Sequence, residues 1–406
     1  MLYNEGWALS KEKSSKFLET SISDNSIAME LLHKEVYILS SMFEARRDKL
    51  VHKLQQQGIS QAFIFDPANV FYYTGFHSEP HERFMAFFIR TETKETHLFV
   101  PALDKDAAQE ATDISSIHAI SDEENPYDII DKSIDSLSGK LGIEGDVLAY
   151  NRSIAFENRF PETQLTDIQG ILSGIRTAKS PEEIKEIQVA IDLIEEVLKQ
   201  GINKVQPGMT EVELTAELEF LMRQLGADGP SFSTIVLSGE KAALPHGVPG
   251  ERKIQQGDLL LIDFGVIKNG YCSDITRTFA IGEPSSHHRE LYELVLKATN
   301  TGIEAVQAGV PLKDIDRAAR KVIEDAGYGD YFNNRIGHGM GIDVHEAPSV
   351  HATNEALAEK GMVFTIEPGI YIPGDTGIRI EDNVYINPEG KVEVLTSFPK
   401  ELQSIT

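Results

Sequence analysis

The stretch LLLIDFGVIKNGYCSDITRTF, residues 259–279, places two acids inside a pair of apolar, β-prone runs. Asp263 follows the run 259–262, and Asp274 lies in a second run after the turn-like Lys268-Asn269-Gly270. This pattern predicts a β-hairpin. In an antiparallel hairpin with a two- or four-residue loop, the two acids lie on one face, directly opposite or one diagonal apart. Two ionised carboxylates this close repel each other, so they require a shared proton, a basic partner or a metal ion.

The composition is that of an ordinary globular protein. The chain has 406 residues, 41% hydrophobic and 25% charged, which is enough for two domains and a large core. The net charge of -26 argues against a nucleic-acid partner or an anionic membrane. With no signal-like start and no run of eighteen apolar residues, we expect a cytoplasmic protein. The single cysteine, Cys272, agrees with a reducing compartment and is interpreted as packing rather than as a nucleophile.

Three parts are expected along the chain. Residues 1–33 are polar and Ser-rich and are interpreted as an N-terminal tail. Residues 34–168 are predicted to form an α/β domain, because an apolar helical stripe ending at Gly58 is followed by the strand-like segments QAFIFD, FMAFFIRT, THLFVPAL and DVLAYN and the helical DKDAAQEA. Residues 169–406 are predicted to form a second domain, since Ser180-Pro181-Glu182-Glu183 has the pattern of a capping box that starts a helix.

A polar cluster in the first domain could suggest a metal site of its own. It consists of His77, Glu79, His81 and Glu82 in FHSEPHERF. These residues have no convergent partners at a known ligand spacing, so the segment is interpreted as a solvated loop, with contacts to the edge of a substrate as the functional alternative.

The second domain contains an internal repeat. GINKVQPGMT, which begins at Gly201, recurs as GIEAVQAGVP at Gly302, and Asp263-Phe264-Gly265 is matched by Glu367-Pro368-Gly369. The second half also ends in a predicted hairpin, VFTIEPGIYIPGDTGIRIEDNVYI, with Glu381 on its return strand. Each half therefore offers two acids on a hairpin, and packing about an approximate two-fold axis would bring all four together.

Four converging carboxylates require cations. Two divalent metal ions would neutralise them. A nitrogen ligand is available at His338 in IGHGMG, where the flanking glycines permit close backbone approach. An oxygen-rich set with one imidazole suits Mn²⁺, Co²⁺ or Zn²⁺, of which Mn²⁺ is the first choice.

At these motifs the chain resembles the pita-bread metallopeptidase family, which includes Xaa-Pro dipeptidase (prolidase), aminopeptidase P, methionine aminopeptidase and the metal-free creatinase. The resemblance covers roughly residues 180–400, and the first domain resembles the creatinase/prolidase N-terminal domain. It implies a mixed α/β (α+β) fold in which an N-terminal α/β domain precedes a pseudo-two-fold catalytic domain. The five metal ligands of the family fall on Asp263, Asp274, His338, Glu367 and Glu381.

The resemblance also implies a mechanism. Bridging carboxylates would hold two metal ions roughly 3.5–4 Å apart, with a water or hydroxide between them that attacks the scissile carbonyl. Glu367 would act as general base and relay the proton to the leaving amine. His246 in LPHGVPG and His345 in DVHEAP match the two histidines that bind substrate and stabilise the tetrahedral intermediate. Arg379 matches the arginine that prolidases use near the substrate carboxylate.

Thr276 and Thr365 each lie two residues from a ligand and are expected to support the ligands by hydrogen bonding. One position departs from the family, because many relatives carry a histidine four residues before the ligand histidine, where this chain has Asn334. The ligand set is unaffected, but peptide length and specificity stay open.

The implied activity is cleavage of Xaa-Pro dipeptides by a homodimer. Aminopeptidase P, which removes the residue before proline from longer peptides, is the alternative, because both enzymes share the ligands and both histidines. A creatinase-like hydrolase or an inactive binding module would be expected to have lost some of the five ligands, and all five are present.

Overall fold

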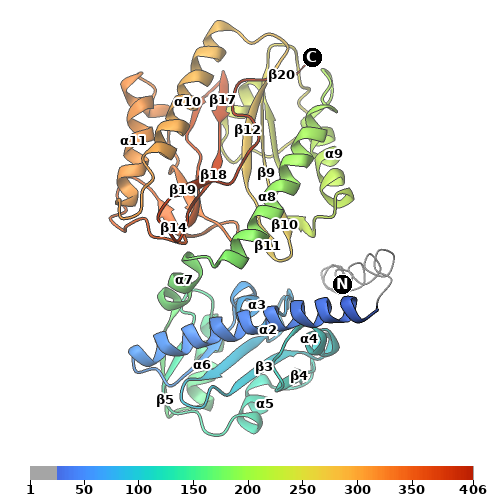
Figure 1. Ribbon diagram of the computed structural model, residues 1–406, viewed down its shortest axis with the longest axis vertical. Helices are drawn as coiled ribbons and strands as arrows, with labels where there is room; N and C mark the ends of the chain where they lie inside the picture. Colours follow the sequence, from blue (N-terminus) through green and yellow to red (C-terminus); the bar gives the residue numbers. More distant parts are fainter. Residues whose placement is uncertain (1–24, 406) are drawn as a thin grey trace. The chain divides into compact units, whose positions relative to one another are not determined.

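The computed structural model describes residues 25–405, with side chains from residue 41 onward. The chain divides into two compact units, with the boundary between Ile175 and Arg176 (Figure 1). Of the tail expected over residues 1–33, residues 1–24 lie outside the described residues. Residues 25–33 belong to the first described helix, α2 (Asn25–Gln56).

The N-terminal unit is built on a six-stranded mixed sheet with the order β4-β3-β2-β1-β5-β6. Strands β1, β2 and β3 pair antiparallel, and the remaining pairs are parallel. Phenylalanine side chains form much of its core, among them Phe63, Phe88 and Phe156, whose rings lie in contact. After α2, its elements are β1 (Gln61–Ile64), α3 (Pro67–Thr74), β2 (Ala86–Arg90), β3 (Thr96–Pro101), η1 (Ala102–Asp104), α4 (Lys105–Ala111), β4 (Ile117–Ile120), α5 (Pro126–Ser133), β5 (Gly139–Ile143), α6 (Tyr150–Arg159) and β6 (Thr163–Asp167), followed by α7 (Gln169–Thr177) at the boundary.

Most segments predicted in this unit are confirmed. QAFIFD, FMAFFIRT and THLFVPAL contain β1, β2 and β3, and DKDAAQEA contains α4. The strand predicted at DVLAYN is wrong. The amides of Val147 and Leu148 both donate to the carbonyl oxygen of Glu144, which closes a turn, and Tyr150 begins α6. The strand lies just before this segment, in β5.

The second unit consists of two halves, each with a helix pair packed on strands (Figure 1). The first half comprises α8 (Pro181–Ile202), α9 (Glu211–Gln224), β7 (Gly229–Pro230), β8 (Ile235–Ser238), η2 (Gly239–Ala243), β9 (Leu259–Phe264), β10 (Val266–Lys268), β11 (Tyr271–Cys272) and β12 (Ile275–Ile281). The second comprises α10 (Ser286–Glu304), α11 (Leu312–Asp325), η3 (Gly329–Tyr331), β13 (Gly337–Gly339), β14 (Glu346–Val350), β15 (Val363–Ile366), β16 (Gly369–Ile372), β17 (Thr376–Arg379), β18 (Asp382–Ile386), β19 (Val392–Val394) and β20 (Ser404–Ile405).

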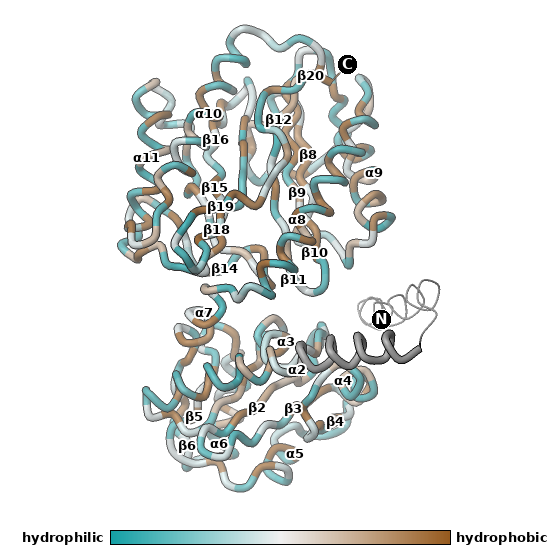
Figure 2. The backbone as a smooth tube through the Cα atoms, viewed as in Figure 1, coloured by the Kyte–Doolittle hydropathy of each residue, from teal (hydrophilic) through white to brown (hydrophobic). Residues whose placement is uncertain are grey.

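Each half has its own apolar core. In the first, residues such as Val197 of α8 and Leu218 of α9 pack with Ile262 of β9. In the second, residues such as Val295 of α10 pack with Phe364 of β15. Figure 2 shows the apolar residues concentrated along the central strands β8 and β9, while the helices carry polar residues as well. The capping box predicted at Ser180 and Glu183 is present at the start of α8.

The predicted hairpin over residues 259–279 is confirmed. Strand β9 pairs antiparallel with β12, and Asp263 lies directly opposite Thr276. Asp274 precedes Thr276 by two residues and so lies one diagonal away from Asp263, on the same face. The turn residues Asn269 and Gly270 have φ of 52° and 79°, the left-handed conformations that a two-residue hairpin loop requires.

Both hairpins are interrupted at their acids. β9 and β12 belong to a four-stranded sheet, whereas β10 and β11 belong to a three-stranded sheet with β7. In the second hairpin β15 pairs with β18, and β16 pairs with β17 in a separate two-stranded sheet. Asp274, Glu367 and Glu381 lie between the paired segments, and Asp263 lies one residue before the end of β9. The break at Gly265 needs a glycine, because a Cβ there would lie 1.9 Å from the carbonyl oxygen of Ser273.

Candidate metal centre

The four acids and the histidine predicted as ligands meet in the second unit. Ligand atoms of Asp263, Asp274 and Glu381 all lie within 4.8 Å of one another, as do those of His338, Glu367 and Glu381. Glu381 belongs to both groups, so the two groups join into one cluster. Its members are almost completely enclosed, with exposed fractions of 8% for Asp263, 4% for Asp274, 3% for His338 and 1% for Glu381.

This cluster has too few hydrogen-bond donors for its charge. Among the residues whose side chains are described, Asp274 Oδ1 and Glu381 Oε1 are buried and have no hydrogen-bond partner. An unpaired buried carboxylate oxygen is costly, and among the side chains that the structure describes, Arg379, paired with Asp263, is the only lysine or arginine in an ion pair with any of the four acids. Divalent metal ions would satisfy both oxygens and offset the charge, so the donor set fits such ions.

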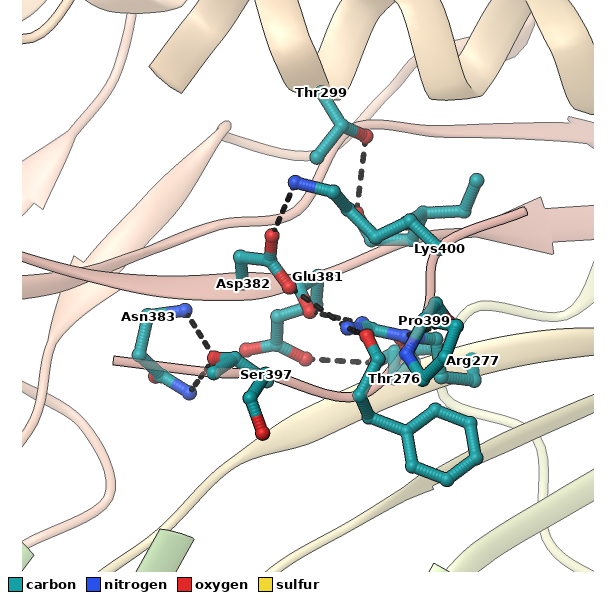
Figure 3. Close-up of polar contacts among 12 residues, drawn as sticks. Thr276, Arg277, Thr299, Glu381, Asp382, Asn383, Ser397, Pro399 and Lys400 are labelled. Atoms are coloured by element: carbon teal, nitrogen blue, oxygen red, sulfur yellow. Dashed lines mark hydrogen bonds and ion pairs between the residues drawn. The ribbon is translucent and has the colours of Figure 1, made fainter. Parts of the chain in front are cut away.

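Hydrogen bonds from threonine hold two of the carboxylates. Thr276 Oγ1 donates to Glu381 Oε2 at 2.7 Å (Figure 3). Thr365 Oγ1 donates to Glu367 Oε1 at 3.1 Å and accepts the backbone N–H of His338. The prediction that both threonines support the ligands by hydrogen bonding is confirmed.

The imidazole of His338 is oriented by its own strand. Nδ1 lies 3.2 Å from the carbonyl oxygen of Gly339, and Nε2 lies 3.3 Å from Glu367 and 3.6 Å from Asp274. With Nδ1 protonated and donating to that carbonyl, Nε2 points at the acids, where the neutral ring offers a lone pair to a metal ion and the protonated ring donates to Glu367. This is the tautomer that metal coordination requires.

Glu381 is also held through its backbone. The guanidinium of Arg277 is buried and donates to the carbonyl oxygens of Thr276 and Glu381, and it pairs with Asp382 at 2.8 Å (Figure 3). Arg277 also donates to the carbonyl oxygens of Phe398 and Pro399 near the end of the chain. Arg277 therefore fixes the backbone at Glu381.

The acids differ in their protonation equilibria. Burial, together with the negative charge of neighbouring acids, raises the pKa of Asp274 and of Glu381 well above the ordinary value. Burial also acts on Glu367, but the hydrogen bond and positive charge of His338 outweigh it and lower the pKa of Glu367. Glu367 also has the most exposed side chain of the four acids, at 15%. It is therefore the acid of the cluster that a bound molecule can reach most easily.

Arg379 is buried at 4% exposure, and each of its three guanidinium nitrogens donates a hydrogen bond to a protein group. Its guanidinium pairs with Asp263, donates through Nη1 to the Tyr371 hydroxyl at 2.7 Å, and donates through Nε to Thr276 Oγ1 at 3.1 Å. Three of its five N–H groups are engaged in this way, which leaves at most two for the substrate carboxylate expected from the sequence.

The two predicted histidines lie at the rim of the cluster. The ring centroid of His345 lies 4.0 Å from that of His338, and a ligand atom of His345 falls within 4.8 Å of His338 and Asp274. Burial, with the positive charges of His338, Arg335 and His246, lowers the pKa of His345 to about 4, so it is neutral at pH 7. His246 is exposed and close enough to contribute to that shift.

Two neighbours of the site were not identified from the sequence. Tyr371 bonds to Arg379, and Asn383 Nδ2 donates to the carbonyl oxygen of Asp274 at 2.7 Å. Strand alternation could have revealed Tyr371. It lies opposite Gly377 in the paired strands, and Gly377 is two residues from Arg379, so the side chains of Tyr371 and Arg379 share one face. Asn334 lies behind Glu367, with Nδ2 at 3.4 Å from the carbonyl oxygen of Glu367.

The polar segment FHSEPHERF forms the loop between α3 and β2, and the structure places none of its residues in a metal-binding group. Across residues 41–405, whose side chains the structure describes, each group of histidine and acidic side chains with metal-binding geometry belongs to the cluster in the second unit. In the same part of the chain, no helix combines the length and apolar character needed to cross a membrane.

Comparison with known proteins agrees with this fold and site. The model of metallopeptidase family M24 matches residues 185–388, and the model of the creatinase/prolidase N-terminal domain matches residues 46–178. A protein of Staphylococcus aureus (strain USA300) described as an uncharacterized peptidase is 40% identical over 352 residues, which cover 87% of this chain and 99% of that protein. The chain belongs to metallopeptidase family M24 and is an enzyme of that metal-dependent class.

Solved structures extend the comparison. A Xaa-Pro dipeptidase from Bacillus anthracis is 33% identical with a TM-score of 0.82, and the match covers 89% of this chain and 99% of that one. A prolidase from Thermococcus sibiricus is 35% identical with a TM-score of 0.83, over the same shares of the two chains. An X-Pro aminopeptidase from Thermotoga maritima is 31% identical with a TM-score of 0.78, over 86% and 98%. The predicted pita-bread fold with its creatinase/prolidase-type N-terminal domain is confirmed.

Proposed function

We propose that this enzyme is a dinuclear-metal Xaa-Pro dipeptidase. The observation that carries the proposal is the enclosed cluster of four carboxylates and one imidazole, in which two carboxylate oxygens have no protein partner among the described residues. The proposed ligands are Asp263, Asp274, His338, Glu367 and Glu381. When bound, two divalent ions would supply Lewis acidity for a peptide carbonyl and lower the pKa of water.

The remaining roles in catalysis and substrate binding are assigned to four side chains of this chain. Glu367, the most exposed of the four acids, accepts the proton of the attacking water and passes it to the leaving amine. His345, neutral at pH 7, can donate a hydrogen bond to the oxygen that becomes negative in the transition state. His246 contacts the substrate from the exposed rim, and Arg379 orients Asp263 through their ion pair.

The preference for a dipeptide is supported by the similarity to a Xaa-Pro dipeptidase and to prolidases. Aminopeptidase P activity is the second candidate, favoured by the comparable similarity to an X-Pro aminopeptidase. The two activities differ in whether a residue is tolerated after proline.

The deciding experiment compares Gly-Pro with Gly-Pro-Xaa at equal concentration, with Mn²⁺ added and with a chelated control. We expect rapid cleavage of Gly-Pro, little release of Gly from the longer peptide, and loss of activity after chelation. Release of Gly from both peptides would establish the aminopeptidase instead. If no divalent metal remained bound after reconstitution, the dinuclear proposal would be wrong.

Four further assignments are proposals of the same kind. We propose Mn²⁺ as the working metal, with Co²⁺ or Zn²⁺ as alternatives, because the donors are mainly carboxylate oxygens. We propose a cytoplasmic location, since Cys272 is buried and free. We propose a homodimer, which light scattering of the purified protein would test. We also propose domain limits of 34–168 and 169–406, with limited proteolysis as the test.

A further inference from the structure

His246 lies on an exposed segment whose two ends are joined by one buried carboxylate, that of Glu211. Glu211 is the first residue of α9, and its exposed fraction is 0%. Its Oε1 accepts the backbone N–H of Ser238 at 2.9 Å and the hydroxyl of Ser238 at 3.1 Å. Its Oε2 accepts Lys241 Nζ at 2.5 Å and the backbone N–H of Gly250 at 3.2 Å. All four donors therefore belong to residues 238–250.

These bonds join the two ends of one loop. Ser238 ends β8, Lys241 lies in η2, and Gly250 closes the segment on its far side. The backbone pairing continues beyond the closure, because the amide of Val212 donates to the carbonyl oxygen of Gly250 and that of Glu211 to the carbonyl oxygen of Arg252. Both ends of the loop are thereby tied to the first turn of α9.

The middle of the loop has little support of its own. In the part of the chain that the structure describes, the backbone amides of residues 244–249 donate only two hydrogen bonds to other backbone groups, Leu244 to Lys241 and Gly247 to Leu244. Both bonds stay inside the loop. Leu244 and Val248, which flank His246, are 54% and 76% exposed. The position of His246 therefore depends on the two anchored ends.

Apart from closing this loop, no contact in the described structure accounts for the free-energy cost of burying Glu211. A carboxylate withdrawn from water is stabilised only when hydrogen bonds and a partner charge replace the lost solvation, and here the loop provides every one of them. We propose that Glu211 is a positioning residue for His246. It closes the loop of residues 238–250 so that the imidazole is held at the rim of the metal cluster. The inference rests on the proposed function, in which His246 contacts the substrate.

The neighbouring Glu213 provides a matched control. It lies two positions further into the same first turn, and its carboxylate accepts the backbone N–H and the hydroxyl of Thr210 in a capping box. No hydrogen bond joins it to residues 238–250 within the described structure. A role of Glu211 limited to the stability of α9 would be reproduced by the loss of Glu213.

The test uses the full chain with Mn²⁺ and Gly-Pro as substrate. In Glu211→Gln, an amide NH₂ faces groups that are themselves donors, so we expect kcat/KM to fall by at least about tenfold. Metal content should be unchanged. In the His246→Ala background, Glu211→Gln should cause little further loss of kcat/KM, because Glu211 is proposed to act on catalysis only through His246. Glu213→Gln should leave kcat/KM near that of the wild type.

Equal losses with and without His246, or equal losses in the Glu211 and Glu213 variants, would overturn the proposal. Hydrogen exchange supplies a readout that needs no substrate. The amides of residues 238–250 should exchange faster in Glu211→Gln and not in Glu213→Gln, and unchanged exchange in both would also overturn it. If wild-type protein bound metal but cleaved neither peptide, the proposed function would fail while the exchange experiment still decided the anchoring. If Glu211→Gln does not fold, the same measurements are made on Glu211→Asp, whose side chain is one methylene shorter.

Discussion

Glu144 of the N-terminal unit and the acids of the metal cluster in the second unit are buried in opposite ways. In the N-terminal unit, Glu144 is completely buried and accepts hydrogen bonds from the amides of Phe65 and Asp66 and from Asn69 Nδ2. In the second unit, Asp274 and Glu381 are nearly as buried, yet each has an oxygen without a protein partner in the described structure. A single acid can be satisfied by nearby N–H groups, whereas a cluster of acids facing one another needs a cation. The difference distinguishes a structural acid from a candidate ligand.

The largest effect should follow from removing a proposed ligand. Asp274→Asn and His338→Ala should each lower turnover of Gly-Pro at least about a thousandfold, because the loss of a ligand removes metal ions that contribute several kcal/mol to transition-state stabilisation. Metal content by mass spectrometry should fall in parallel. His351→Ala, which alters a histidine bonded to Thr353 outside the cluster, is the control and should retain both properties. Near-normal turnover with full metal occupancy in either ligand variant would contradict the assignment.

A smaller effect is expected at Arg379. In Arg379→Met the carboxylate of Asp263 loses its partner, so activity should fall roughly 10- to 100-fold, the range seen when groups that orient metal ligands are removed. Because each guanidinium nitrogen already donates to a protein group, the fractional loss should be equal for Gly-Pro and for a longer peptide that the enzyme cleaves detectably. A loss confined to the dipeptide would instead support the role of Arg379 at the free carboxylate of the substrate.

The smallest effect on catalysis is expected at Glu144. Burial raises its pKa from 4.5 to about 7, so this acid favours folding when protonated. Its contribution is complete below about pH 4.5 and is lost as the pH rises through 7. Between pH 5 and pH 8 the wild type should therefore lose roughly 2–3 kcal/mol of unfolding free energy relative to Glu144→Gln.

Urea unfolding of both proteins at the two pH values measures this difference. Turnover of Gly-Pro and metal content should be the same in both proteins. If Glu144→Gln lost metal or activity, the distinction between the two kinds of buried acid would not hold.

Much of the catalytic unit could be predicted from the order of residues. The capping box at Ser180, the hairpin around Asn269-Gly270 and the repeat that relates Asp263 to Glu367 depend on local backbone preferences and on spacing. Alternation along a strand is equally local, so it placed Asp263 and Asp274 on one face before any contact was known. The error at DVLAYN has a local origin too, because an apolar run of that length does not by itself distinguish a strand from a turn that enters a helix.

The sequence by itself therefore determined which side chains could form a metal centre, since their type, order and hairpin register follow from short-range rules. Only the tertiary structure decided how they are used. It showed that Arg379 pairs with Asp263 and Tyr371, that His345 joins Asp274 and His338, and that Glu211 closes the loop of His246. These contacts join residues 7 to 116 positions apart, and their geometry depends on how separate strands and helices pack. Packing of that kind is set by shape and by the cost of unpaired buried charge, and neither can be read from spacing along one chain.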